Sequence, residues 1–188
     1  SVTVNKATLT VAGLTVNSKS YDGTAVASTS GTAVLGGSTS ALAAANTDKV
    51  SLTTTTPGAA FAQANASPSP ISVLLSGYSL AASGGSPSAQ AAILANYNLD
   101  LTGYSGLITP KALTITAPTL ASKVYDATTV AGTLTVGTVS GLVGSDKVVV
   151  TGTAGSLNSA NVGTTTASVT YVLANGTSGL ASNYSLAS

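Results

Sequence analysis

Short stretches of the chain alternate apolar and polar residues with a period of two. In the first of them, Leu9 and Val11 point to one side of an extended chain, and Thr8 and Thr10 point to the other. The same alternation recurs at residues 50–52, 71–75, 97–101, 113–116, 148–150 and 169–173. This pattern is typical of half-buried β-strands, and turn signals separate the strands roughly every 8–12 residues. The sequence therefore predicts an all-β fold, either an antiparallel sandwich or a barrel.

Landmarks of the first half of the chain return in the same order in the second half. NKATLTV (5–11) returns as PKALTIT (110–116), KSYDGT (19–24) as KVYDAT (123–128), TDKVSL (47–52) as SDKVVV (145–150), QAN (63–65) as SAN (159–161), and NYNL (96–99) as NYSL (183–186). The chain is therefore two copies of one unit. We place the first copy at 1–108 and the second at 109–188. We expect two tandem Ig-like β-sandwich modules, and their short junction predicts an elongated, stiff pair.

The first copy is longer than the second because it contains Gly-, Ser- and Pro-rich insertions. Most of the extra length falls in residues 28–47 and 76–95, and this composition predicts long loops. Within the second stretch, SPSAQAAILANY (86–97) is rich in Ala and is the best candidate for a short helix.

A small cluster of Lys, Tyr and Asp occurs once per copy in a chain that otherwise has little charge. Its members are Lys19, Tyr21 and Asp22 in the first copy, and Lys123, Tyr125 and Asp126 in the second. We interpret the cluster as structural: each Tyr buries its ring and hydrogen-bonds through its hydroxyl. Each Asp accepts backbone N–H groups in a turn, and each Lys pairs loosely with a carboxylate. Because Gly23 aligns with Ala127, we expect that this position is not left-handed.

These motifs resemble a known family. K-x-Y-D-G-T, a D-K-V strand, an A-N segment, A-N-Y-x-L and I-T-P-K-A-L-T-I resemble the YDG-type repeat of filamentous-haemagglutinin-like adhesins, the large bacterial surface proteins of two-partner secretion. The resemblance covers nearly the whole chain, once per copy. Two departures are that the second copy reads Y-D-A, and that Thr47 stands where a Gly is expected before Asp48. The resemblance implies β-rich modules strung in tandem between a secretion domain and adhesive or anchoring ends.

Charge and composition exclude several classes of function. The 188 residues include six Lys and five Asp, but no Arg, Glu, His or Cys, and the net charge is +1. This balance gives no reason to bind nucleic acid or anionic lipid. The longest apolar runs, at 71–75 and 91–95, are much shorter than the roughly 20 residues of a spanning helix, so we expect no membrane insertion. The lack of Cys excludes a disulfide.

The same composition leaves little room for catalysis or for a cofactor. Without His and Cys, most nucleophilic and general-base designs are absent, and we expect no enzyme activity. Five scattered Asp residues make a poor calcium site, so we expect no metal and no cofactor. Two modifications stay open. One is a Lys–Asn isopeptide cross-link, and the other is glycosylation at acceptor patterns that begin at Asn65, Asn175 and Asn183.

The most specific hypothesis from the sequence is a structural spacer. We expect a stalk repeat of a secreted adhesin at the bacterial cell surface, serving cell adhesion or biofilm formation. Its partners would be neighbouring repeats of the same polypeptide, with polysaccharide or a host surface bound through other regions. The alternative is a module that binds carbohydrate or matrix through the insertions of the first copy, with Tyr78 and Tyr104 as exposed aromatic rings.

Overall fold

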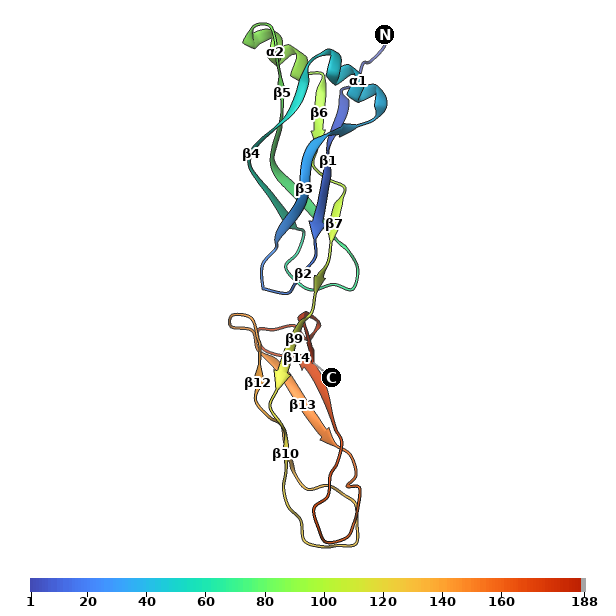
Figure 1. Cartoon of the computed structure of the whole chain (residues 1–188), viewed down its shortest axis with the longest axis vertical. Helices are drawn as coiled ribbons and strands as arrows, with labels where there is room; N and C mark the ends of the chain where they lie inside the picture. The colour runs from blue at the N-terminus through green and yellow to red at the C-terminus, as the bar shows by residue number, and fades with distance from the viewer. Residues whose placement is uncertain (187–188) are drawn as a thin grey trace. The chain divides into compact units, whose positions relative to one another are not determined.

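The chain forms two compact units in a computed structural model that describes residues 1–186 (Figure 1). Unit 1 comprises Ser1–Lys19, Thr24–Ala64 and Pro68–Ile108, and unit 2 comprises Ser20–Gly23, Asn65–Ser67 and Thr109–Ser188. The units therefore do not coincide with the two sequence copies. Two short segments of the first copy, Ser20–Gly23 and Asn65–Ser67, belong to unit 2.

Unit 1 is built on one sheet of six strands in the order β6-β1-β3-β4-β5-β7. The strands are β1 (Ala7–Asn17), β3 (Val26–Gly37), β4 (Val50–Phe61), β5 (Ile71–Ala82), β6 (Tyr97–Asp100) and β7 (Tyr104–Gly106). Neighbouring strands are antiparallel except for β1 and β6, which are parallel, with Leu9 opposite Leu99. Two further short strands are β2 (Lys19–Ser20) and β8 (Ile108–Thr109).

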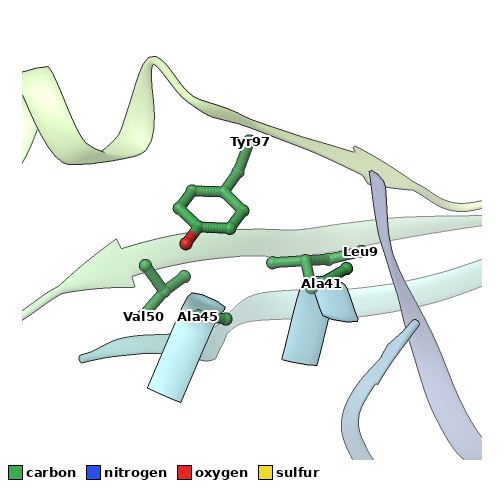
Figure 2. Packing of buried hydrophobic residues seen from close by; sticks show 5 residues of the cluster. All are labelled: Leu9, Ala41, Ala45, Val50 and Tyr97. Atoms are coloured by element: carbon green, nitrogen blue, oxygen red, sulfur yellow. The ribbon is translucent and has the colours of Figure 1, made fainter. Parts of the chain in front are cut away.

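Two short helices lie at the same end of the unit 1 sheet, as Figure 1 shows. Helix α1 (Thr39–Thr47) begins at Ser38, whose hydroxyl accepts a hydrogen bond from a first-turn N–H group. Helix α2 (Pro87–Leu94) begins in the same way at Ser86 and has Pro at its start, where the missing N–H costs nothing. Figure 2 shows Tyr97 among the buried residues of this end of the sheet, which are Leu9, Ala41, Ala45 and Val50.

Unit 2 contains shorter strands in three small sheets. The strands are β9 (Lys111–Ile115), β10 (Thr119–Leu120), β11 (Leu134–Thr135), β12 (Val139–Ser140), β13 (Val148–Ala154), β14 (Val169–Asn175) and β15 (Tyr184–Leu186), and a 3-10 turn, η1 (Ala181–Asn183), precedes β15. Strands β12, β9 and β15 form one sheet, in which β15 and β9 are parallel. The pairs β10–β11 and β13–β14 form the others. Leu113 on β9 is fully buried, as its repeat equivalent Leu9 is in unit 1.

The all-β prediction is confirmed, with one parallel strand pair in each unit that the antiparallel expectation did not include. An Ig-like arrangement stays a prediction. The helix expected within 86–97 is present as α2. None of the helices among the described residues is long and apolar enough to span a bilayer.

The expectation of two long loops at 28–47 and 76–95 was wrong. Residues 28–37 continue strand β3, 39–47 form helix α1, 76–82 continue strand β5, and 87–94 form helix α2. Ser, Thr and Gly in these stretches occupy exposed strand faces and strand irregularities, where their composition resembles that of loops.

Candidate functional site at the tyrosine-aspartate motifs

Each Lys of the Lys-x-Tyr-Asp motif closes the loop that carries the Tyr. The Lys19 ammonium donates to the Thr24 carbonyl over 2.7 Å and to the Thr24 hydroxyl over 3.0 Å. In the second copy, the Lys123 ammonium donates to the carbonyl and the hydroxyl of Thr128 over 3.0 and 2.9 Å. Because both copies make the same pair of bonds, the loop has the same closure whether its Tyr is buried or exposed.

The acid of the second motif holds the turn together. Asp126 forms an ion pair with Lys123 over 2.7 Å and accepts hydrogen bonds from the backbone N–H and the hydroxyl of Thr128 over 3.0 and 2.9 Å. The Lys123 ammonium, followed by the two Thr128 donors, lowers the pKa of the exposed Asp126 carboxyl to about 2. The bonds of Asp126 are thus local, and the carboxylate stabilises the loop from which Tyr125 projects.

The residue after the motif Asp is left-handed in both copies. Gly23 has a φ of 80°, and Ala127 has a φ of 60°. The expectation that a position shared by Gly and Ala is not left-handed was therefore wrong. Closure of the loop by Lys and Asp holds Ala127 in this region, although its Cβ makes the conformation costly by about 1 kcal/mol.

The two motif tyrosines have opposite environments. Tyr21 is 7% exposed and forms part of unit 2. Its ring meets the ring of Tyr184 edge to face, with centroids 5.4 Å apart. Its hydroxyl donates to Asp146 Oδ2 over 2.9 Å, and the Tyr184 hydroxyl donates to the same oxygen over 2.6 Å. The Tyr184 oxygen accepts in turn from the N–H of Val143, while the N–H of Tyr21 donates to the carbonyl of Thr109.

Both hydroxyls of this cluster act as neutral donors to one carboxylate. Burial, followed by the hydrogen bond to Asp146, raises the pKa of Tyr184 to about 12. The same causes in the same order raise the pKa of Tyr21. An ionised phenol beside the carboxylate would place two negative charges together in a partly desolvated site, so both rings keep their protons through the neutral pH range.

A pair of asparagines forms a second connection inside unit 2. Asn183 is 2% exposed and is the one polar residue in the buried core of the described chain. Its Nδ2 donates to Asn65 Oδ1 over 3.0 Å, and its Oδ1 accepts from the N–H of Ala66 over 2.9 Å. Both partners come from the Asn65–Ser67 segment of the first copy. Unit 2 therefore contains two elements of that copy, one built around Tyr21 and one around Asn65.

Unit 1 contains the repeat equivalents of Asp146, Tyr184 and Asn183. The Tyr97 hydroxyl donates to Asp48 Oδ2 over 2.8 Å, as the Tyr184 hydroxyl does to Asp146. Burial and this hydrogen bond raise the pKa of Tyr97. Figure 2 shows its ring above Val50, with the hydroxyl turned toward the start of β4. Asn96, which corresponds to the buried Asn183, is exposed.

The repeat equivalents of Tyr21 and Asn65 lie at the surface of unit 2. Tyr125 is 60% exposed, and Asn161 is also exposed. Both residues line one hollow of about 480 Å³, together with Lys123 and Val162. The two side chains that unit 2 takes from the first copy thus have exposed counterparts on one part of the second.

Tyr78 and Tyr104, expected as exposed rings, are both half-buried in unit 1. Tyr104 starts β7, and its hydroxyl donates to the carbonyl of Val11 over 2.8 Å. Burial, and next the neighbouring Tyr78, raises the pKa of Tyr104. Tyr78 lies within strand β5, opposite Thr54, and not in a loop.

The sequence placed Lys19, Tyr21, Asp22, Lys123, Tyr125 and Asp126 in the motif, but it did not place Asp146, Tyr184, Asn183 and Asn65 around Tyr21. The available signal was the repeat itself, because all four belong to the segments that recur: SDKVVV, NYSL and QAN. Among residues 1–186, no three His, Cys, Asp or Glu side chains gather as metal ligands.

Comparison with known proteins gives one family for both copies. The YDG domain family matches residues 5–103 and again residues 109–188. No curated protein matches the chain, and neither does any solved structure. The two matches together cover nearly the whole length, and each includes one Lys-x-Tyr-Asp loop and one Asp-Tyr pair. The chain belongs to the YDG domain family, of which it contains two copies.

Proposed function

We propose that this chain is a structural spacer, a stalk segment of a secreted bacterial surface adhesin that positions adhesive regions outside the cell. The observation that carries the proposal is that unit 2 buries Tyr21 and binds Asn65, both from the first sequence copy. Consecutive copies are thus joined by buried contacts in addition to the peptide chain. A spacer built from repeats requires such a connection to transmit force from one repeat to the next.

The contacts are strong enough to matter mechanically. A buried tyrosine ring contributes about 2 kcal/mol of transfer free energy, and a hydrogen bond to a carboxylate contributes about 1.5–3 kcal/mol. The Asn65–Asn183 bond and the Ala66 N–H bond add to this within unit 2. The contacts that Tyr21 and the Asn65–Ser67 segment make within unit 2 therefore contribute several kcal/mol in total. They do so without a disulfide, in a chain that has no Cys.

Membership of the YDG family supports a role as a repeat. The low charge supports close succession of repeats, because six Lys and five Asp give little electrostatic repulsion between neighbouring repeats. The resemblance to filamentous-haemagglutinin-like adhesins supplies the extracellular, cell-surface setting. In this proposal, polysaccharide or host surfaces bind other regions of the parent protein. The segment itself has no catalytic role and needs no cofactor.

The second candidate is a binding module in unit 1. It is favoured by a hollow of about 520 Å³ at Tyr78, lined also by Leu14, Ala27 and Pro57. A partly exposed aromatic ring beside apolar side chains is a surface on which a sugar ring could stack. In unit 2, Tyr171 lies opposite Gly152 as Tyr78 lies opposite Thr54 in unit 1, so a binder in unit 1 would depend on the hollow beside Tyr78 and not on the ring alone.

The test is direct binding of the purified chain to a panel of glycans, bacterial exopolysaccharides and matrix proteins. Without saturable binding at high micromolar concentration, the spacer proposal holds. Saturable binding that is lost in Tyr78→Ala and kept in Tyr125→Ala would replace it with a binding module in unit 1. The Tyr125 variant is the matched control because it removes an exposed ring from the other unit.

A further inference from the structure

We propose that unit 1 has a docking site for another copy of this repeat, formed by Asp48 and Asn96 beside the buried Tyr97. The partner supplies a Tyr and an Asn at the positions that Tyr125 and Asn161 occupy in this chain. The inference concerns how repeats recognise each other. It rests on the geometry of unit 2 and stands whether or not the segment is a spacer.

Unit 2 shows the occupied form of the site. Asp146 Oδ2 accepts two phenol hydroxyls, one from Tyr184 on β15 and one from Tyr21 of the first copy. In unit 1, Asp48 has the same bond from Tyr97. Asp48 is half-buried, so the residue lies at the surface of the unit and not in its core. The arrangement of Asp and Tyr is thus present in both units, and the donor from another copy is present in one.

The equivalent asparagines Asn183 and Asn96 differ between the units in the same way. Asn183 is 2% exposed because the Asn65–Ser67 segment covers it and hydrogen-bonds both ends of its amide. Asn96 holds the same place next to Tyr97 but is exposed. The side-chain amide of Asn183 therefore hydrogen-bonds a neighbouring segment in unit 2, whereas Asn96 is exposed to solvent in unit 1.

The complementary surface is present on unit 2. Tyr125 is 60% exposed where Tyr21 is 7% exposed, and Asn161 is exposed beside the same hollow. The loop of Tyr125 is closed by Lys123 and Thr128 in the same way as the loop of Tyr21 is closed by Lys19 and Thr24. The binding loop is therefore already ordered, which reduces the entropy cost of docking.

Exposed apolar side chains support the same pair of surfaces. Within the described chain, the large apolar side chains exposed by more than 80% are Val2, Val4, Val124 and Val162. Val124 and Val162 adjoin Tyr125 and Asn161. By the strand register that equates Leu9 with Leu113, Thr109 corresponds to Asn5, the residue next to Val4, and in unit 2 the Thr109 carbonyl accepts the N–H of Tyr21. The extended chain before β1 would thus receive the backbone of an incoming Tyr–Asp loop, as Thr109 does.

The occupant is a second copy because each contact needs the residue type that another copy provides. The carboxylate takes a phenol hydroxyl, and Asn96 takes an amide and a backbone N–H. The ring of Tyr97 is 5% exposed and already packs with Ala41 and Ala45 of α1, so it holds Asp48 in place and offers no open face itself. Separate chains should associate weakly, since the surfaces are small. A short tether raises the effective concentration to about 1 mM and makes the same contact stable.

The test is an NMR self-titration of the full chain. Isotope-labelled chain is mixed with unlabelled chain up to about 2 mM, in the range of tethered effective concentrations. We expect concentration-dependent shifts at the backbone amides of Asp48, Asn96 and Tyr97, and also at those of Tyr125 and Asn161. Unlabelled Tyr125→Ala should lose the unit 1 shifts. Unlabelled Val172→Ala, which removes another exposed apolar side chain of unit 2, should keep them.

A cross-linking experiment identifies the pairing in the same chain, which has no native Cys. Chains with Asn96→Cys are mixed with chains carrying Asn161→Cys and treated with a short bismaleimide. We expect a mixed dimer, and at least fivefold less of it when Ser30→Cys replaces Asn96→Cys. Equal cross-linking of both pairs, absence of shifts at millimolar concentration, or shifts confined to other surfaces would each overturn the proposal. The last result would indicate a different self-association.

Discussion

The hydroxyl of Tyr21 donates to Asp146 Oδ2 over 2.9 Å, although 125 positions separate the two residues in the sequence. Tyr21 belongs to the motif of the first copy, and Asp146 belongs to the second. The bond therefore gives the motif of the first copy a role in the core of unit 2. In each copy the Lys closes a loop that presents a Tyr, and in unit 2 the Tyr of the first copy completes the core.

The first prediction compares the two motif tyrosines. Tyr21→Phe should lower the free energy of unfolding of unit 2 by about 1.5 kcal/mol, because it removes a hydrogen bond to the Asp146 carboxylate while the ring still packs on Tyr184. Tyr125→Phe should change it by less than about 0.5 kcal/mol, since that side chain is 60% exposed. Native-state hydrogen exchange of the β13 and β14 amides measures the effect.

Tyr21→Ala extends this comparison, because it also removes the ring and should cost about 3 kcal/mol. The amides of strands β3 and β4 in unit 1 provide the internal reference. Equal loss of protection from the Tyr21 and Tyr125 variants would contradict the assignment of Tyr21 to the core of unit 2.

Sequence reasoning reached the strands and the repeat, because both depend on local pattern. Alternation at Leu9 and Val11 marks β1, and the same alternation at Leu113 and Ile115 marks β9. The resemblance reached the YDG family by the order of the recurring motifs. The strands could be predicted because a half-buried strand requires apolar and polar residues to alternate along it, and this alternation is visible in the sequence.

The environment of Tyr21 could not be derived in this way. Tyr21 and Tyr125 have nearly the same neighbours in sequence, but one is buried and the other is exposed. The difference arises from long-range contacts with Asp146 and Tyr184, which no local pattern encodes. Helix α1 was missed for a different reason: Ser38 and the following Ala-rich turn lie in a stretch whose Gly and Ser content resembles that of a loop.

The second prediction concerns the asparagine pair. Asn183→Ala should destabilise unit 2 by about 2 kcal/mol, because it leaves the Ala66 N–H and the Asn65 amide without their partner in a buried position. Asn96→Ala is the matched control and should be close to neutral, as Asn96 is exposed. Urea unfolding followed by NMR of each unit separates the two effects. A similar loss of unfolding free energy in both variants would show that the buried hydrogen bonds of Asn183 do not stabilise unit 2.

The third prediction concerns alkaline pH. Burial raises the pKa of Tyr184 in the folded chain from 10.0 to about 12, so above pH 10 the unfolded chain loses a proton that the folded chain retains. The stabilising contribution is complete below pH 10 and is lost as pH rises to about 12. Unit 2 should therefore become less stable across this window. Tyrosinate absorbance should show a late-titrating component, and Tyr184→Phe should remove it. A titration unchanged by this substitution would contradict the assignment.

The fourth prediction tests the left-handed position of the motif loop in both copies. Ala127→Gly should stabilise the second loop by up to about 1 kcal/mol, because Gly relieves the steric cost at a φ of 60°, offset in part by the greater freedom of the unfolded chain. Gly23→Ala should have the opposite sign and a larger size, because a Cβ there would also lie 3.1 Å from Cγ1 of Val143. Exchange rates of the Thr128 amide report the first change, and protection of β13 reports the second. If both substitutions changed stability in the same direction, the two loops would not share the backbone conformation that presents Tyr21 and Tyr125. The shared closure by Lys19 and Lys123 predicts that they do.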